Sequence, residues 1–265
     1  MENLTLQGTR VPRIGLGTWN LRGDICRKTV IEAFAMGYRH IDTAEMYRNE
    51  HQMGQGLAQS DVDRDDVFLV SKVWTSNLRY ADTRRACDES LRRLKVDTID
   101  LYLIHWPSAE IPLEETLQAM KELQAMGKIQ HAGVSNFSPE HMNEARRLFQ
   151  APLFCNQVPF HPYHHQAALL ERCIQEEMLL TAYSPLAKGR VARDATLQEI
   201  GHKYNKTAAQ VSLRWLLQHQ NVAVIPKASH GKHLKDNLAI FDFALDEADI
   251  QKIAPLDPLH GINPV

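Results

Sequence analysis

The chain has 265 residues, with 30 Lys and Arg against 32 Asp and Glu, so its formal net charge is −2. This balance excludes the strongly basic surface expected of a protein that binds nucleic acid or an anionic membrane. Hydrophobic residues make up 44% of the chain and charged residues 23%, which excludes an intrinsically disordered chain. No apolar run reaches the roughly 18 residues of a membrane-spanning helix, so no membrane partner is expected.

The cysteines indicate the compartment. Cys26, Cys87, Cys155 and Cys173 are far apart in the sequence and form no CxxC motif. Such cysteines are expected to be free thiols in a reducing environment. The first residues contain no apolar core of a signal peptide. We therefore expect a cytoplasmic protein.

A short hairpin is predicted first, over residues 4–12, because Gly8 lies between two runs of alternating apolar and polar residues. Eight short apolar runs then recur along the chain, each followed by a segment with helical periodicity. Continuous apolar runs of this length are typical of strands buried on both faces. The predicted strands begin near Ile14, His40, Val67, Ile99, His131, Phe154, Leu179 and Val222.

The segments between these runs are predicted to be helices, because their apolar residues recur three and four positions apart. The interval before the last strand is longer than the others, and we expect an additional helix there, over residues 195–204. The expected buried faces are formed by Ile31, Phe34 and Ala35; by Cys87, Leu91 and Leu94; by Leu113, Leu117 and Met120; and by Ala208, Val211 and Trp215.

Eight strand–helix units without a linker predict an α/β fold, a single (β/α)8 barrel that forms one domain over residues 1–265. The hairpin is expected to lie at the bottom of the barrel. The alternative is an open, doubly wound sheet, which would carry a GxGxxG turn if it bound a dinucleotide. The first strand offers only Gly15-Leu16-Gly17, without the third glycine.

Polar side chains stand at the carboxyl ends of three consecutive strands, where barrel active sites are built. Asp42 ends the second strand and Tyr47 follows in its loop, Lys72 lies within the apolar run VSKVW, and His105 lies in LIHWP. An ammonium group beside a phenol lowers the pKa of the phenol, and a carboxylate holds the ammonium charged. These four groups suit acid catalysis by Tyr47 during reduction of a carbonyl. The hydride then has to come from a nicotinamide cofactor.

These residues also carry a resemblance. The string GYRHIDTAEMYRNEHQMG over residues 37–54 resembles a signature of the aldo-keto reductase family, and SKVW, LIHWP, GVSNF, NQVPFHPY, AYSPL and IPKA follow in the family order. The resemblance covers the whole chain. It implies that Asp42, Tyr47, Lys72 and His105 form a catalytic tetrad and that the enzyme reduces aldehydes and ketones with NADPH. The short loops are similar to those of compact bacterial members that reduce diketogluconate, methylglyoxal and other small carbonyls.

The resemblance also implies a cofactor site across the carboxyl ends of the strands. Ser135, Asn136 and Gln157 match residues that bind the nicotinamide carboxamide, and Tyr183 matches the aromatic residue that stacks on the nicotinamide ring. Lys227 matches a lysine that binds the 2′-phosphate of NADPH. The remaining residues assigned to the cofactor in this way are Gly17, Thr18, Ser184, Leu186, Ser229, His233 and Asn237. Trp19, Trp74 and Trp106, with His105, match positions that line the substrate pocket.

Two positions after the last strand depart from the family pattern. Ala228 replaces a serine, although Ser229 follows it, and His233 replaces an arginine. Because an imidazole is only partly charged at neutral pH, we expect a weaker clamp on the 2′-phosphate.

The sequence also bears on two other classes of function, a metal-dependent hydrolase and a redox-sensing subunit. A metal-dependent hydrolase would need a ligand cluster on an early strand, and none is found there. The HPYHH segment, with His161, His164 and His165, is read as structural, so no metal is expected. The chain could also bind NADPH as a redox-sensing partner subunit without turnover. The resemblance favours a monomer.

Overall fold

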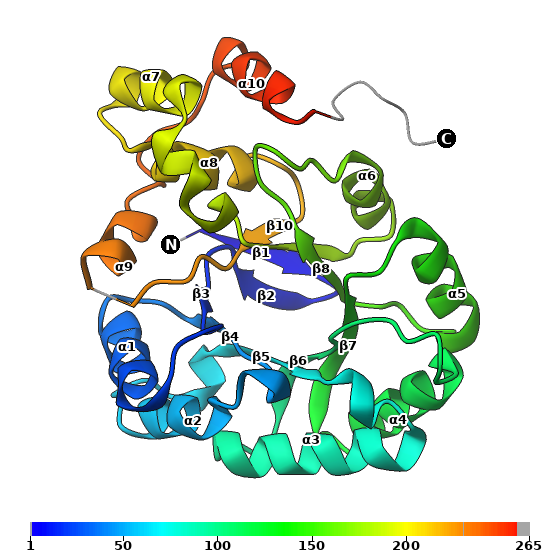
Figure 1. Ribbon diagram of the computed structural model, residues 1–265. Coiled ribbons are helices and arrows are strands. Elements are labelled where there is room, and N and C mark those ends of the chain that lie inside the picture. Colours follow the sequence, from blue (N-terminus) through cyan, green and yellow to red (C-terminus); the bar gives the residue numbers. More distant parts are fainter. Residues whose placement is uncertain (1, 230, 259–265) are drawn as a thin grey trace.

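The computed structural model describes residues 2–229 and 231–258. Parallel strands form the centre of the molecule and helices surround them in a ring (Figure 1). The strands of the central sheet are β3 (Leu16–Gly17), β4 (His40–Asp42), β5 (Phe68–Val73), β6 (Ile99–Ile104), β7 (Ile129–Ser135), β8 (Cys155–Pro159), β9 (Leu179–Tyr183) and β10 (Val222–Val224).

Each strand pairs in parallel with its neighbour in chain order, from β3 to β10. The first and last strands also meet. The Gly15 amide donates to the Val224 carbonyl at 2.8 Å, and the Val224 amide donates to the Arg13 carbonyl at 2.9 Å. These bonds close the sheet, so the predicted barrel is confirmed and the open doubly wound sheet is excluded.

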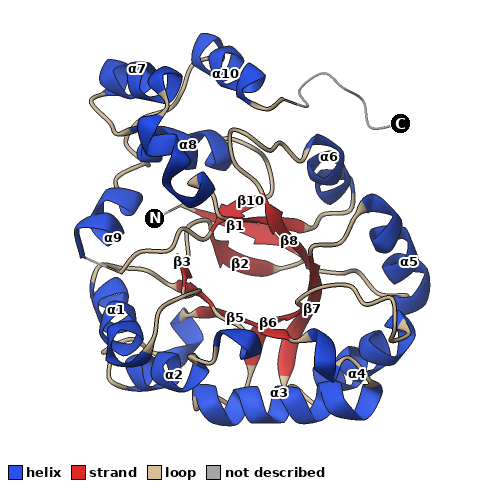
Figure 2. Ribbon diagram, in the orientation of Figure 1, coloured by secondary structure: helices blue, strands red, loops and turns tan. Residues whose placement is uncertain are grey.

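The ring outside the barrel consists of helices (Figure 2). Six predicted strand starts are correct to within one residue. β7 begins two residues earlier than predicted, and the first run forms only a bridge at Ile14 before β3 begins. The described helices are α1 (Gly23–Ala35), α2 (Glu50–Ala58), α3 (Tyr80–Leu94), α4 (Leu113–Ala125), α5 (Pro139–Phe149), α6 (Ala167–Gln175), α7 (Ala195–Tyr204), α8 (Ala208–Leu217), α9 (Gly231–Leu238) and α10 (Glu247–Ile253). Short 3₁₀ turns are η1 (Glu45–Tyr47), η2 (Arg64–Asp66), η3 (Thr75–Asn77), η4 (Ala187–Arg193) and η5 (Ala254–Leu256).

The additional helix expected before the last strand is α7, with the predicted bounds. Its first turn begins at Asp194, whose carboxylate accepts the Leu197 amide at 3.0 Å. The buried face of α1 is different from the prediction. Val30, Ala33 and Phe34 are buried there, whereas Ala35 is exposed, because the stripe that faces the barrel lies about one residue earlier in the helix.

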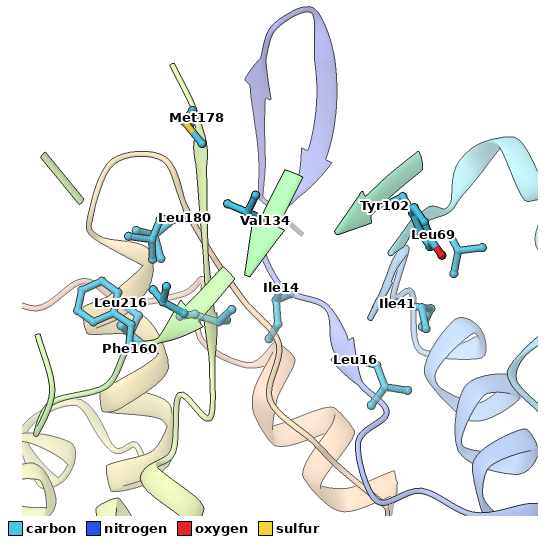
Figure 3. Packing of buried hydrophobic residues seen from close by; sticks show 14 of the residues in the cluster. Ile14, Leu16, Ile41, Leu69, Tyr102, Val134, Phe160, Met178, Leu180 and Leu216 are labelled. Atoms are coloured by element: carbon cyan, nitrogen blue, oxygen red, sulfur yellow. The ribbon is translucent and has the colours of Figure 1, made fainter. Parts of the chain in front are cut away.

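Two hydrophobic layers hold the barrel. The outer layer lies between strands and helices, as with Leu180 of β9 and Leu216 of α8 (Figure 3). The inner layer fills the barrel itself, with side chains such as Phe68, Leu101 and Phe154. None of the described helices is long and apolar enough to span a membrane.

The hairpin consists of β1 (Asn3–Leu6) and β2 (Thr9–Pro12). Its two turn residues, Gln7 and Gly8, have φ of 47° and 78°, the left-handed pair that a type I′ hairpin turn requires. Leu6 and Val11 belong to the inner hydrophobic layer. The hairpin therefore covers the amino ends of the strands, as predicted.

Candidate active site

Alternation along β5 directs Lys72 into the barrel. Phe68 and Val70 belong to the inner layer, whereas Leu69 and Val73 pack in the outer layer. Because strand side chains alternate between the two faces, Lys72 points inward, one step above Val70. Its side chain is 0% exposed, so its charge requires a partner inside the barrel.

The same rule places two further groups on the inner surface. Asp42 is paired in register with Val70, and His105 follows the inner residue Leu103 by two positions. Asp42 is 1% exposed and His105 is 6% exposed. The barrel thus brings a carboxylate and an imidazole to the level of Lys72.

Tyr47 completes the group from η1, the turn that follows β4. The Lys72 ammonium donates to Asp42 Oδ1 at 2.6 Å and to the Thr43 carbonyl at 2.8 Å, and it lies 3.4 Å from the Tyr47 hydroxyl. The rings of Tyr47 and His105 meet edge to face, with centroids 5.6 Å apart. The structure therefore brings together the four residues that the sequence selected.

Opposed effects set the charge of Lys72. Burial alone would lower the pKa of this ammonium, but the carboxylate of Asp42 and the hydroxyl of Tyr47 outweigh burial, and the net pKa is raised. Lys72 therefore stays charged at neutral pH. The buried ion pair with Asp42 holds that charge in place.

The pKa of Tyr47 differs from the expectation. Burial raises it, and although the Lys72 ammonium lowers it as predicted, the net pKa lies above the usual value. The prediction that the pKa of Tyr47 is lowered is wrong for this structure. Burial destabilises the phenolate more than the single neighbouring ammonium stabilises it. The hydroxyl is therefore fully protonated at neutral pH.

His105 is neutral at physiological pH. Burial, reinforced by the Lys72 charge, lowers its pKa to about 3. Its Nδ1 atom is buried and has no hydrogen-bond partner among the described residues. A buried N–H without an acceptor costs more than a buried lone pair, so we infer that the proton resides on Nε2.

Residues assigned to the cofactor by resemblance are bonded directly to this group. The Gln157 amide donates to Asp42 Oδ2 at 2.7 Å. Asn136 donates to the backbone carbonyl of His105 at 3.0 Å and accepts the Tyr183 hydroxyl at 2.8 Å. Ser135 donates to the Gln157 carbonyl at 2.9 Å. One hydrogen-bonded network therefore joins the expected nicotinamide residues to the buried ion pair.

Gly17 and Thr18 contact the barrel itself. The Thr18 amide and hydroxyl both donate to the Asp42 carbonyl at 2.9 Å. A Cβ at Gly17 would lie 2.6 Å from the Ile225 carbonyl oxygen, so a larger residue would disturb the closure between β3 and β10. In this structure the two residues position the strand that carries Asp42.

The other expected cofactor residues lie after β9 and β10. Ser184 has φ of 49°, and after Leu186 the backbone is left-handed again at Ala187, Lys188 and Gly189. This cluster of strained conformations is typical of a binding loop.

Beyond β10, Lys227 is exposed and its ammonium lies 3.4 Å from the Ser229 hydroxyl. His233 is exposed on α9. Asn237 is buried, and its side-chain amide faces the hydroxyl of Tyr38. The described part of this segment thus presents an exposed ammonium group at Lys227 and a buried amide at Asn237.

The three tryptophans occupy different environments. The Trp74 ring meets His105 edge to face at 5.1 Å. Trp19 and Trp106 are 51% and 44% exposed. Within the described residues, Trp74 is the tryptophan whose ring contacts the four-residue group.

Sequence reasoning missed two polar residues around Tyr47. Asn49 is fully buried, donates to the carbonyls of Thr18 and Leu21, and accepts the Thr43 hydroxyl at 2.8 Å. Glu45 accepts the Trp74 amide at 2.9 Å. Both lie inside the string that carries the resemblance, so polar residues in that short loop were the available signal.

Among the described residues, no group of three His, Cys, Asp or Glu side chains is placed to hold a metal ion. In the HPYHH segment, His161 and His164 form a backbone bridge and His165 contacts the Pro162 carbonyl. The four cysteines are buried and unpaired.

Comparisons with known proteins agree with this geometry. The model of the aldo/keto reductase family matches residues 13–258. A glyoxal reductase of Bacillus subtilis is 39% identical over 97% of this chain and 93% of its own length. A crystal structure of a putative 2,5-diketo-D-gluconic acid reductase B superposes with a TM-score of 0.95 at 41% identity, over 100% of this chain and 95% of that one.

A further solved structure is a mutant of Gox0644 in complex with NADPH, which has a TM-score of 0.92 and 37% identity over 100% of this chain and 96% of that one. The fold, the polar group at the carboxyl ends of the strands and the matched length thus point the same way. The expected class, an oxidoreductase, is confirmed. The chain belongs to the aldo/keto reductase family.

Proposed function

We propose that this protein reduces small aldehydes and ketones to alcohols with NADPH, and that Tyr47 supplies the proton. The observation that carries the proposal is the buried Lys72 ammonium, bonded to Asp42 and lying 3.4 Å from the Tyr47 hydroxyl. Solved relatives include a complex with NADPH, which supports the same cofactor here.

The residues present fit such a cofactor. Asn136, Tyr183 and Gln157 form a polar, interconnected wall beside the tetrad, suited to an amide-bearing ring. Lys227 is an exposed cation suited to a phosphate, and Asn237 of α9 offers an amide group suited to an adenine nitrogen. When bound, NADPH supplies the hydride.

Tyr47 fits the role of proton donor. Its raised pKa keeps the hydroxyl protonated at rest, so the proton is available when negative charge develops on a carbonyl oxygen. After transfer, the phenolate is stabilised by the Lys72 ammonium. Asp42 holds Lys72 charged and oriented throughout.

His105 fits a different role. A histidine with a pKa of about 3 carries no additional proton at neutral pH, so it is a poor general acid. With the proton on Nε2, the neutral ring can donate a hydrogen bond to the carbonyl oxygen and orient it toward Tyr47. This division of roles follows from burial beside Lys72.

The relatives support small carbonyls as substrates. One is named a glyoxal reductase and another a putative diketogluconic acid reductase. The test is a panel of aldehydes and ketones at fixed NADPH, with kcat/KM measured from the loss of NADPH absorbance. NADPH binding without turnover on any carbonyl would favour the redox-sensing subunit instead.

We further propose that the chain acts as one domain, as a monomer, in the cytoplasm. Barrel closure between β3 and β10 supports one folding unit, and four buried unpaired thiols fit a reducing compartment. Light scattering after size-exclusion chromatography tests the monomer, since a mass near 30.2 kDa is expected.

A further inference from the structure

Glu45 joins two loops at the mouth of the site. It begins η1, the turn that ends at Tyr47, and its carboxylate reaches across to the loop after β5. Oε2 accepts the Trp74 backbone amide at 2.9 Å, and Oε1 accepts the Asn77 side-chain amide at 2.5 Å. Both partners are donors, so this carboxylate satisfies the two of them together.

The loop that Glu45 holds carries an aromatic ring of the site. Trp74 begins the loop and packs edge to face on His105. On its far side the loop is anchored independently, because Thr83 of α3 donates to the Asn77 carbonyl at 2.8 Å. Without Glu45 the loop would lose these two hydrogen bonds to η1.

We propose that Glu45 is a positioning residue that determines substrate selectivity, because it holds the indole ring of Trp74 at a set distance from Tyr47. The inference rests on the proposed function and deepens it. A carbonyl substrate with an aromatic ring can pack that ring against Trp74, so its binding depends on where Trp74 lies. A two- or three-carbon dicarbonyl needs only Tyr47 and His105. Glu45 therefore favours aromatic aldehydes over the smallest dicarbonyls.

The experiment compares kcat and KM for benzaldehyde and for methylglyoxal at saturating NADPH. Glu45→Ala is expected to lower kcat/KM for benzaldehyde about tenfold, mainly through KM, and to change methylglyoxal less than about threefold. The Kd for NADPH, from quenching of tryptophan fluorescence, should stay within about twofold of the wild type.

Two variants keep the test valid if Glu45→Ala folds poorly. Asn77→Asp places a carboxylate against Glu45 and should reproduce the loss of selectivity by repulsion. Glu45→Gln in that background offers an oxygen to the Trp74 amide and an NH₂ group to the aspartate at position 77. This double variant should recover the selectivity of the wild type.

Glu115 is the matched control. It also accepts a backbone amide from the region after β5, that of Tyr80, at 3.2 Å, but it lies on α4. Glu115→Ala should leave the ratio of the two kcat/KM values unchanged. An unchanged ratio in Glu45→Ala and in Asn77→Asp, or an equal change in Glu115→Ala, would overturn the inference. A wild type that reduces neither aldehyde would instead overturn the proposed function.

Discussion

The two ends of the barrel use buried polar groups in opposite ways. At the carboxyl end, Lys72 and Asp42 are buried as charges and paired at 2.6 Å. At the amino end, under the hairpin, His40 and His131 are held by hairpin oxygens, the Pro12 carbonyl and the Thr9 hydroxyl. Burial lowers the pKa of both histidines, so they are neutral at physiological pH.

This difference shows how one barrel separates chemistry from stability. A buried ion pair is costly to desolvate, so the intact pair adds little to the stability of the fold. If one partner is removed, the other is left as an unpaired buried charge, which strongly destabilises the fold. Inside the barrel, the amino end contains apolar side chains and neutral rings, which stabilise the fold without supplying charge. Changes at the carboxyl end should therefore affect turnover first, and changes at the amino end should affect stability alone.

The largest effect is expected for Tyr47→Phe. Loss of a positioned proton donor should lower kcat by about 10²–10⁴-fold. The Kd for NADPH should stay near that of the wild type, because the ring of residue 47 is retained. A Phe variant that keeps more than about a tenth of the wild-type kcat in a chemistry-limited reaction would exclude Tyr47 as the acid.

Lys72→Met should impair both activity and stability. Removal of the ammonium leaves Asp42 buried without its cation, which should lower the free energy of unfolding by about 3–5 kcal/mol. The phenolate of Tyr47 also loses its stabilising charge, so raising the pH should not restore turnover. Urea unfolding and a pH–rate profile test this, and an active, fully stable Met variant would contradict it.

At the amino end, Leu6→Ala should lower the free energy of unfolding and leave catalysis unchanged. Leu6 is buried in the inner hydrophobic layer, so the truncation should cost about 2–5 kcal/mol. The values of kcat and KM measured below the unfolding temperature should not change. Leu4→Ala is the control, because Leu4 is only partly buried against the same layer. A fall in kcat for Leu6→Ala with unchanged stability would show that the amino end also supports turnover.

A smaller effect is expected from His131 as the pH falls. Burial lowers its pKa from 6.5 to about 4, so between these values the unfolded chain binds a proton that the folded protein does not. Stability should therefore decrease as the pH falls from about 6.5 toward 4, and this contribution should be absent above that window.

His131→Gln keeps a hydrogen-bonding group for Thr9 but does not titrate, so its stability should depend less steeply on pH in this window. The measurement is the urea midpoint at several pH values. His202→Gln, at an exposed position of α7, is the control and should leave the pH dependence as in the wild type. Equal slopes for His131→Gln and the wild type would show that His131 does not contribute to the pH dependence of stability.

Much of this organisation is predictable from the sequence, for a physical reason. Short apolar runs predict buried strands. A charged residue inside such a run, as at Lys72, has few explanations other than a functional group that is paired with an opposite charge. The carboxyl ends of neighbouring strands converge in any barrel, so Asp42, Lys72 and His105 could be placed together without coordinates. The hairpin and α7 followed equally from local patterns.

Other features needed the structure because they depend on side chains far apart in the sequence. The net pKa of Tyr47 depends on how deeply the phenol is buried. The local sequence around Tyr47 does not predict that depth. The contacts of Glu45 with Trp74 and Asn77 join two separate loops. The buried face of α1 was misplaced by about one residue, because several apolar stripes fit its sequence equally well.

Isotopic labelling can follow hydride transfer to a carbonyl carbon with Tyr47 as the proton donor. The test incubates the wild type and Tyr47→Phe with an aldehyde and with NADPH in which both hydrogens at C4 of the nicotinamide are deuterium, and then determines deuterium in the alcohol by mass spectrometry. We expect alcohol labelled at the former carbonyl carbon with the wild type, and at least about a hundredfold less of it per unit time with the Phe variant. Unlabelled alcohol, or equal labelling rates in the two proteins when chemistry limits the rate, would contradict it.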